Sequence, residues 1–207
     1  MKSDRAIGVA GISLVLLATI TVTSVRAQNA TPVRVRGSIE SIDGQDLTVK
    51  SREGNSVKIK LAPDYTVTAV VKAEMTDVVV GKYVGIAAVP QANNAEKAIE
   101  VLILPEPARG SGEGHYAWDL TPESMMTNAT IAETAEQPDG RALTLKHKDG
   151  ENRIIVPKDV PIVTFVPGER TLVAPGAGIL VSVVKQPDGT MTGSRVVVGK
   201  NGVNPPM

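Results

Sequence analysis

Apolar and polar side chains alternate along short runs of this chain, and glycine-containing turns separate the runs. In VRVRGSI (33–39), for example, Val33, Val35 and Ile39 fall on one face of an extended strand. This period of two predicts half-buried β-strands, whereas only AEMTDV (73–78) is expected to form a helical turn. The predicted strands are 33–39, 47–50, 56–61, 65–71, 82–89, 97–104, 161–166, 177–184 and 193–199.

The strand pattern repeats within the chain. DGQDLTVKSREGNSVKI (43–59) matches DGRALTLKHKDGENRII (139–155) in one register, 96 residues apart. Further along, Gly81 matches Gly176 at a separation of 95 residues, so the two stretches differ by a single one-residue slip. A match of this length in nearly one register predicts a tandem duplication.

The duplication predicts the organisation of the chain. The two copies span 33–104 and 128–199, joined by a Gly/Pro-rich connector (105–127) and followed by a short tail (200–207). Five or six short strands per copy favour two small, tandem, antiparallel β-barrels, each marginal alone and supported by its neighbour. One larger sandwich built from both copies is the alternative. Aromatic residues are only 2% of the chain, so aliphatic side chains must form the cores.

The motif residues of the first copy resemble those of a bacterial exported domain family of unknown function. The resemblance implies OB-like β-barrels and, because it rests on turn glycines and core aliphatics, it implies a fold and little about activity. The second copy departs from the motif at its first strand, where Glu133 and Ala135 replace Gly37 and Ile39. The motif residues are Gly37, Ile39, Asp43, Gly44, Leu47, Val49, Val80, Gly81, Val84 and the stretch 98–101.

The first 27 residues have the features of a secretory signal peptide. Lys2 and Arg5 form a positive n-region, an apolar run spans 6–22, and Ala27 ends an A-x-A-like cleavage site. A retained membrane anchor is the alternative, for which the apolar run is short. We therefore predict cleavage after Ala27 and an exported protein, periplasmic or secreted, with no membrane span after cleavage.

Composition argues against several classes of partner and modification. The chain has 22 basic and 22 acidic residues and no cysteine, which excludes disulfides and a lipid-modified cysteine. Loss of the signal peptide would bring the net charge to about −2, which gives no attraction to nucleic acid or anionic lipid. The predicted strands carry only Tyr65, Tyr83 and Phe165 as aromatics, too few for a base-stacking surface. We expect no nucleic-acid partner.

The connector carries the most distinctive chemistry. Its stretch RGSGEGHYAWDL (109–120) holds the only tryptophan, one of two histidines and one of three tyrosines. One hypothesis is a ligand site between the two barrels in which Arg109 holds an anion, Tyr116 and Trp118 stack on the ligand, and His115 with Glu113 coordinates it. The other is a structural clamp, in which Trp118 fills the junction between the barrels. The candidate site residues are Arg109, Glu113, His115, Tyr116, Trp118 and Asp119.

A metal site is a further possibility that the connector raises. His115 with Glu113 would supply one nitrogen and one carboxylate ligand, and the spacing matches no recognised metal cage. Because one strong nitrogen ligand makes a poor site, we predict no bound metal and no other cofactor. His115 and Glu113 remain the only metal-ligand candidates.

No pattern in the sequence indicates catalysis. The chain has no cysteine nucleophile, no G-x-S-x-G elbow, no P-loop, no dinucleotide fingerprint and no HExxH motif. We therefore predict a non-enzymatic exported binding or envelope-maintenance module, with an envelope partner or a small ligand that the sequence does not identify. The alternative is a periplasmic protein that binds a small ligand or a metal at the connector.

Overall fold

The structure, a computed structural model, describes residues 33–92 and 95–205, so the predicted signal peptide (1–27) lies outside it. Within these residues the chain is all-β, as predicted: twelve strands are joined in one hydrogen-bonded network, and the other regular elements are short 3-10 helices. None of the helices described is long and apolar enough to cross a membrane.

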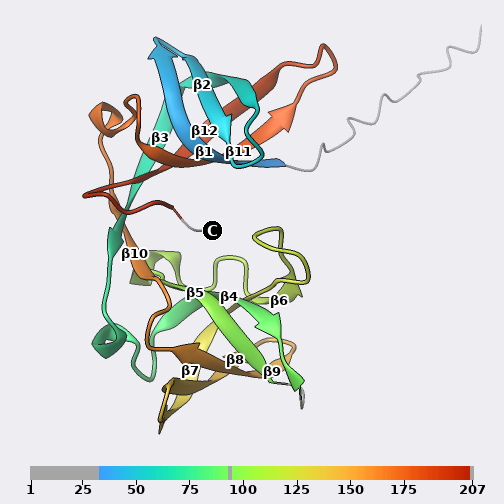
Figure 1. Ribbon diagram of the computed structural model, residues 1–207, viewed down its shortest axis with the longest axis vertical. Helices are drawn as coiled ribbons and strands as arrows, with labels where there is room; N and C mark the ends of the chain where they lie inside the picture. Colours follow the sequence, from blue (N-terminus) through green and yellow to red (C-terminus); the bar gives the residue numbers. More distant parts are fainter. Residues whose placement is uncertain (1–32, 93–94, 206–207) are drawn as a thin grey trace, which may run out of the picture.

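Five strands close into a first barrel, which forms the upper lobe of Figure 1. Neighbouring strands are antiparallel except β3 and β12, which are parallel. The core is aliphatic apart from Tyr65, with Val49, Val181 and Val196 fully buried. Around the ring the strands are β1 (Val33–Asp43), β2 (Asp46–Ser51), β3 (Ser56–Lys72), β12 (Met191–Gly199) and β11 (Gly178–Lys185).

A second barrel of the same design forms the lower lobe (Figure 1). Its strands follow the same order and directions, with β9 and β5 as the parallel pair, so both belong to the small five-stranded barrels that include OB folds. An extra strand, β6 (Gly114–Ala117), pairs with the first residues of β7. The ring strands are β7 (Met125–Gln137), β8 (Gly140–His147), β9 (Gly150–Pro157), β5 (Glu96–Ile103) and β4 (Tyr83–Pro90).

The barrels do not follow the boundaries predicted from the repeats, 33–104 and 128–199. The first barrel combines β1, β2 and β3 with β11 and β12, whereas the second combines β4 and β5 with β7, β8 and β9. The reason is the length of β3, which continues beyond the first core to Lys72 and carries the chain to the second lobe. The second barrel is thus a contiguous segment, and the two ends of the chain form the first.

The same spacing recurs between the elements of the two halves. The helix η1 (Met75–Asp77) precedes η4 (Arg170–Leu172) by 95 residues, and β4 and β5 precede β11 and β12 by the same number. The backbone hydrogen bond from Ala73 N–H to the Ile162 carbonyl has a counterpart from Gly168 N–H to the Val67 carbonyl. The two donors are 95 residues apart, and so are the two acceptors. The one-residue slip therefore lies earlier than the sequence comparison placed it, in the turn after β2.

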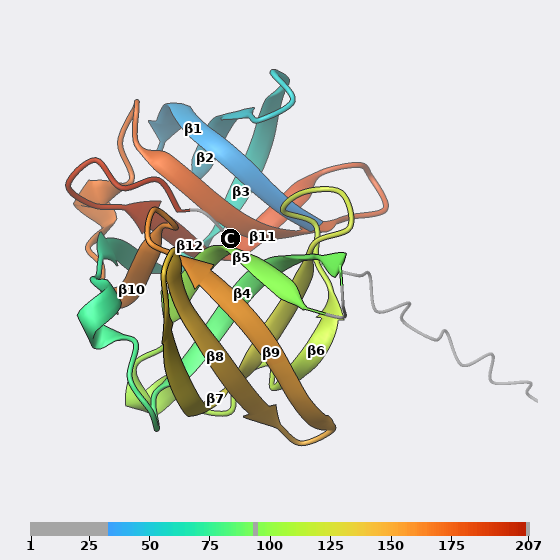
Figure 2. The ribbon, with the colours of Figure 1, turned by 60° about the horizontal axis from the view of Figure 1, so that its bottom comes forward.

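The lobes meet along a crossing pair of strands. β10 (Ile162–Pro167) runs antiparallel to the end of β3 and parallel to the end of β5. Val70, Leu102 and Val197 bury their side chains in a third apolar cluster there, against which Phe165 packs. Figure 1 shows β3 and β10 running between the two lobes, and Figure 2, in which the bottom of that view comes forward, shows β7, β8 and β9 side by side in the second lobe.

This pairing predicts which fragment folds alone. A chain of residues 73–168 contains every strand of the second barrel, so it should unfold cooperatively and give dispersed amide NMR signals. A chain of residues 33–104, one sequence copy, contains only three strands of one ring and two of the other, so it should stay unfolded or aggregate. A cooperative transition for 33–104 with none for 73–168 would contradict the observed ring closure.

Candidate functional site

The connector crosses from the second barrel to the first. After η3 (Glu106–Ala108) it turns, adds β6 to the edge of β7, and then reaches β1 of the first barrel through Trp118 and Asp119. Gly112 has a positive φ of 61°, and a Cβ there would lie 2.8 Å from Asn128 Nδ2. Glycine is therefore required at this close approach.

Trp118 and Asp119 bind two arginines of β1. The Arg34 guanidinium lies 3.9 Å from the centre of a Trp118 ring, and Arg36 lies 5.9 Å from it. Arg36 Nη2 donates a 2.8 Å hydrogen bond to Asp119, and Arg34 lies 3.6 Å from the same carboxylate oxygen. Burial acts to raise the pKa of Asp119, but Arg36 and Arg34 outweigh it and lower that pKa. These contacts join the lobes.

Tyr116 is held inside the connector. Its ring lies 6.0 Å from Trp118 in an edge-on arrangement, and its hydroxyl accepts a 2.8 Å hydrogen bond from Asn128 Nδ2. The same Asn128 amide also donates to the Gly112 carbonyl at 3.0 Å. The pair of aromatic rings predicted as a stacking platform is thus half-buried and tied to β7.

Arg109 already has an anion within the protein. Its guanidinium makes two 2.8 Å bonds to the Glu106 carboxylate and a third of 2.9 Å to the Gly81 carbonyl. Glu113 lies near Tyr83. The pKa of the Tyr83 hydroxyl is raised to about 12, mainly by burial and to a smaller extent by the negative charge of Glu113. Within the part of the chain that the structure describes, neither Arg109 nor Glu113 forms a hydrogen bond or ion pair with Trp118, so the six candidates do not converge on one point.

His115 contacts Glu96 and Thr127 rather than Glu113. Its Nδ1 lies 2.9 Å from Thr127 Oγ1, and its Nε2 lies 3.5 Å from Glu96 Oε1. Burial raises the pKa of Glu96, and His115 opposes that rise. An acid, a histidine and a hydroxyl are in line, yet Thr127 is 0% exposed, so its hydroxyl is inaccessible to a substrate.

The residues the structure describes offer no metal cage. Nowhere in 33–92 or 95–205 do three or more His, Cys, Asp or Glu side chains gather closely enough to hold a metal ion. His115 and Glu113, the predicted metal-ligand candidates, have the separate contacts described above.

A buried acid at the junction was not among the predicted site residues. Glu100 is 1% exposed, and its two carboxylate oxygens have no hydrogen-bond partner within the described residues. Burial raises its pKa to about 8, although the charges of Arg36 and Arg52 act in the opposite direction. In the sequence, Glu100 occupies one polar position of an alternating strand and looks solvent-exposed. In the folded chain it lies instead near Arg36 and Arg52 of the first barrel.

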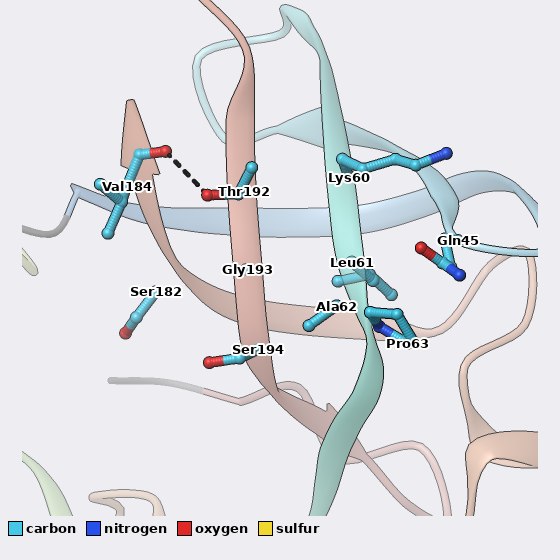
Figure 3. A pocket seen from close by; sticks show the side chains of 10 residues that line it. All are labelled: Gln45, Lys60, Leu61, Ala62, Pro63, Ser182, Val184, Thr192, Gly193 and Ser194. Carbon is cyan, nitrogen blue, oxygen red and sulfur yellow. Dashed lines mark hydrogen bonds between the residues drawn. The ribbon is translucent and has the colours of Figure 1, made fainter. Parts of the chain in front are cut away.

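Two adjoining grooves lie on the first barrel. The β3 groove, of about 380 Å³, is lined by Lys60, Pro63, Ser182, Thr192 and Ser194 among others, and Figure 3 shows their side chains around it. The loop groove, of about 650 Å³, lies between the β1–β2 turn and the β11–β12 turn. Lys60 lines both grooves. The loop groove is lined by Asp43, Asp46, Thr48, Lys58, Asp188 and Thr190 among others.

The β3 groove owes its shape to a bulge. Leu61 pairs with Gly193 and Thr66 pairs with Arg195, so four residues of β3 face a single residue of β12. Arg170 fixes the bulge, because its Nη2 donates 3.0 Å bonds to the carbonyls of two residues in that stretch, Pro63 and Tyr65. The groove is therefore a built feature of the strand and was not predicted from the sequence.

Comparison with known proteins found no matching family model, no matching curated protein and no matching solved structure. The resemblance to an exported domain family therefore stays a prediction, and functional proposals rest on the geometry of this chain.

The first prediction from this geometry concerns Glu100. Between about pH 4.5 and pH 8 the folded chain keeps a proton on Glu100 that the unfolded chain releases, so the free energy of unfolding should fall as pH rises through this window. Glu100→Gln should remove that slope, up to about 1.4 kcal/mol per pH unit. Denaturant unfolding at several pH values measures it. Exposed Glu133→Gln is the control, and an unchanged slope in Glu100→Gln would contradict the assignment.

The second prediction concerns the end of the connector. Asp119→Ala removes the carboxylate that holds Arg34 and Arg36 beside Trp118. Trp118 should then become more exposed, so its emission should move to longer wavelength and acrylamide quenching should increase. Because Trp118 is the only tryptophan, the signal is unambiguous. Asp64→Ala, at an exposed position outside the connector, should leave the emission unchanged; equal changes in both variants would argue against the contact.

Proposed function

We propose that this chain is a non-enzymatic, exported binding module of the cell envelope, built from a tandem duplication of OB-like β-barrels. The signal peptide predicted at 1–27 supports export, and the equal spacing of elements in the two halves supports duplication. The observation that carries the binding function is the pair of adjoining grooves on the first barrel, which meet at Lys60.

The position of the loop groove favours ligand binding. It lies over β2 and β3, between the β1–β2 turn and the β11–β12 turn. Counted along the chain, these turns join the first strand of the barrel to the second and the fourth to the fifth. This is the surface that OB folds use for oligonucleotides and oligosaccharides. The absence of aromatic side chains from the groove lining argues against bases, which need stacking platforms.

The lining chemistry favours a hydroxylated, extended ligand. Thr48 and Thr190 supply hydroxyls that both donate and accept hydrogen bonds. At the β3 groove, the Thr192 hydroxyl accepts a 2.9 Å bond from Gln186 Nε2 and donates a 3.4 Å bond to the Val184 carbonyl. Lys60 supplies a charged donor, positioned by 3.0 and 3.1 Å contacts to the Asp46 carboxylate. The Asp188 carboxylate accepts a 2.9 Å bond from the Thr190 amide, which lowers its pKa and keeps it ionised. An oligosaccharide segment fits this mixture of hydroxyls and both charges.

Titration with a soluble oligosaccharide, followed by amide NMR shifts, tests the proposal. Chitohexaose should shift signals of the loop groove and β3 groove, and Lys60→Ala should weaken binding at least about fivefold by removing a charged donor. Lys72→Ala is the matched control, because Lys72 also forms a 3.0 Å ion pair but lies outside both grooves.

Two results would count against the proposal. Ligand-induced NMR shifts that are the same in Lys60→Ala, or that fall outside the grooves, would contradict the assignment of the binding site. Turnover of hydrolase substrates that is lost in His115→Ala would show an enzyme instead, because His115 belongs to the one acid–histidine–hydroxyl alignment described.

A second candidate function, small-ligand binding at the connector, is favoured by one observation. A cavity of about 620 Å³ lies at the junction, and connector residues Pro105, Pro107, Ala108 and Ser111 form part of its wall. The metal version of this alternative has no comparable support in the described residues.

A further inference from the structure

The two barrels carry an acidic and a basic side chain at one shared strand position. β5 and β12 hold the same place in their rings. Glu96 of β5 pairs with Ile154, Met191 of β12 pairs with Ile59, and the second pair lies at residue numbers that differ from the first by 95. Glu100 and Arg195 are also 95 residues apart, so they occupy equivalent positions. One barrel thus has an acid, and the other a base, at this position.

The protein itself places basic side chains beside Glu100. Arg36, which is 8% exposed, and Arg52 lie close enough to the Glu100 carboxyl group to act on its pKa. Both arginines belong to the first barrel, whereas Glu100 belongs to the second, so the acid faces basic groups across the junction. Glu100 is 1% exposed, so no external ligand reaches it.

The Arg195 side chain has no such partner. It is exposed and makes no hydrogen bond or ion pair with any residue that the structure describes. It lines the junction cavity, whose other residues include Leu104, Pro105, Phe165 and Val197. Among the described residues that line this cavity there is no Asp, Glu or Lys, so Arg195 is the one charged side chain in a mainly apolar wall.

We propose that the junction cavity binds a small amphiphile with one carboxylate and an apolar chain, and that Arg195 holds the carboxylate. The inference extends the second candidate function and is independent of the grooves on the first barrel. In the equivalent position of the other barrel the facing groups of opposite type, Arg36 and Arg52, come from within the chain. At Arg195 the opposite charge comes from the ligand.

Charge and size both favour this class of ligand. A guanidinium presents two parallel N–H groups that match the two oxygens of a carboxylate. Phe165, Leu104 and the cavity prolines offer apolar surface to the chain of the ligand. The volume of about 620 Å³ lies within the range of small-molecule sites, about 300–1,000 Å³.

The connector residue predicted to hold an anion does not perform this role. Arg109 is committed to Glu106 and to the Gly81 carbonyl. The connector instead contributes apolar wall, through Pro105, Pro107 and Ala108, to a cavity whose cation comes from β12.

Calorimetric titration of the purified full chain with octanoate, 1-octanol and octylammonium tests the proposal. These probes share a chain and differ only in charge. Octanoate should bind at least about tenfold more tightly than octanol, because it gains a charge-assisted bond to Arg195, and octylammonium should bind most weakly. Arg195→Gln should reduce the affinity for octanoate to the affinity for octanol.

Two further variants make the test specific. Arg153→Gln removes another exposed arginine, on β9, and should leave octanoate binding unchanged. Thr68→Phe places a ring at the cavity wall and should abolish binding of octanoate and octanol together. Arg195 is exposed, so its replacement should preserve the thermal unfolding temperature, which confirms that lost binding is not lost folding.

The following results would overturn the proposal. Equal affinity for octanoate and octanol, or unchanged octanoate binding in Arg195→Gln, would remove the role of the charge. Binding to phosphatidylglycerol vesicles but not to free octanoate would indicate a lipid surface instead of a free carboxylate. Lys60→Ala should leave octanoate binding intact and Arg195→Gln should leave chitohexaose binding intact, so failure of one site is distinguishable from failure of the other.

Discussion

The antiparallel pairing of β3 with β10 is the constraint on which the rest of the structure depends. Residues 68–72 of β3 pair with 163–167 of β10, and each strand thereby leaves one lobe for the other. Val70 and Val163 are buried at this crossing, which fixes the lobes against each other through apolar contact. Because of the crossing, neither ring contains a whole sequence copy, and the site residues of the junction come from segments distant in sequence.

The strands were predictable from alternation, but their partners were not. The alternation of apolar residues at Val35, Ile39 and Leu47 does not tell which strands close their barrel. β4 and β5 carry an aliphatic pattern similar to that of β11 and β12, so either pair would match. Which strands close the barrel depends on whether the chain folds back after Ala69 or continues as a strand. β3 has no glycine or proline after Ala69 that would end the strand there. Local sequence therefore determined the elements and left the connection open.

The candidate site shows the same limit. The distinctive chemistry of Arg109 and Trp118 was visible in the sequence, yet both residues bind partners inside the protein, Glu106 and Arg34. Glu100 and Arg195 looked like ordinary exposed positions of alternating strands. Their importance arises in the folded protein, where the acid is enclosed and the arginine lines a cavity. No single-strand pattern records that difference.

The exchange of strands also has a consequence for the order of folding. Ile59 and Met191 pair across the first ring although 132 residues separate them, and closing so long a loop directly would be slow. The second barrel lies wholly between them in the sequence. Once it forms, it brings Lys72 next to Val163, so the two chain segments that build the first barrel start from neighbouring positions. Until the last strand arrives, β1 and β3 have open edges that invite wrong pairing. The central barrel is thus the template on which the outer one is assembled.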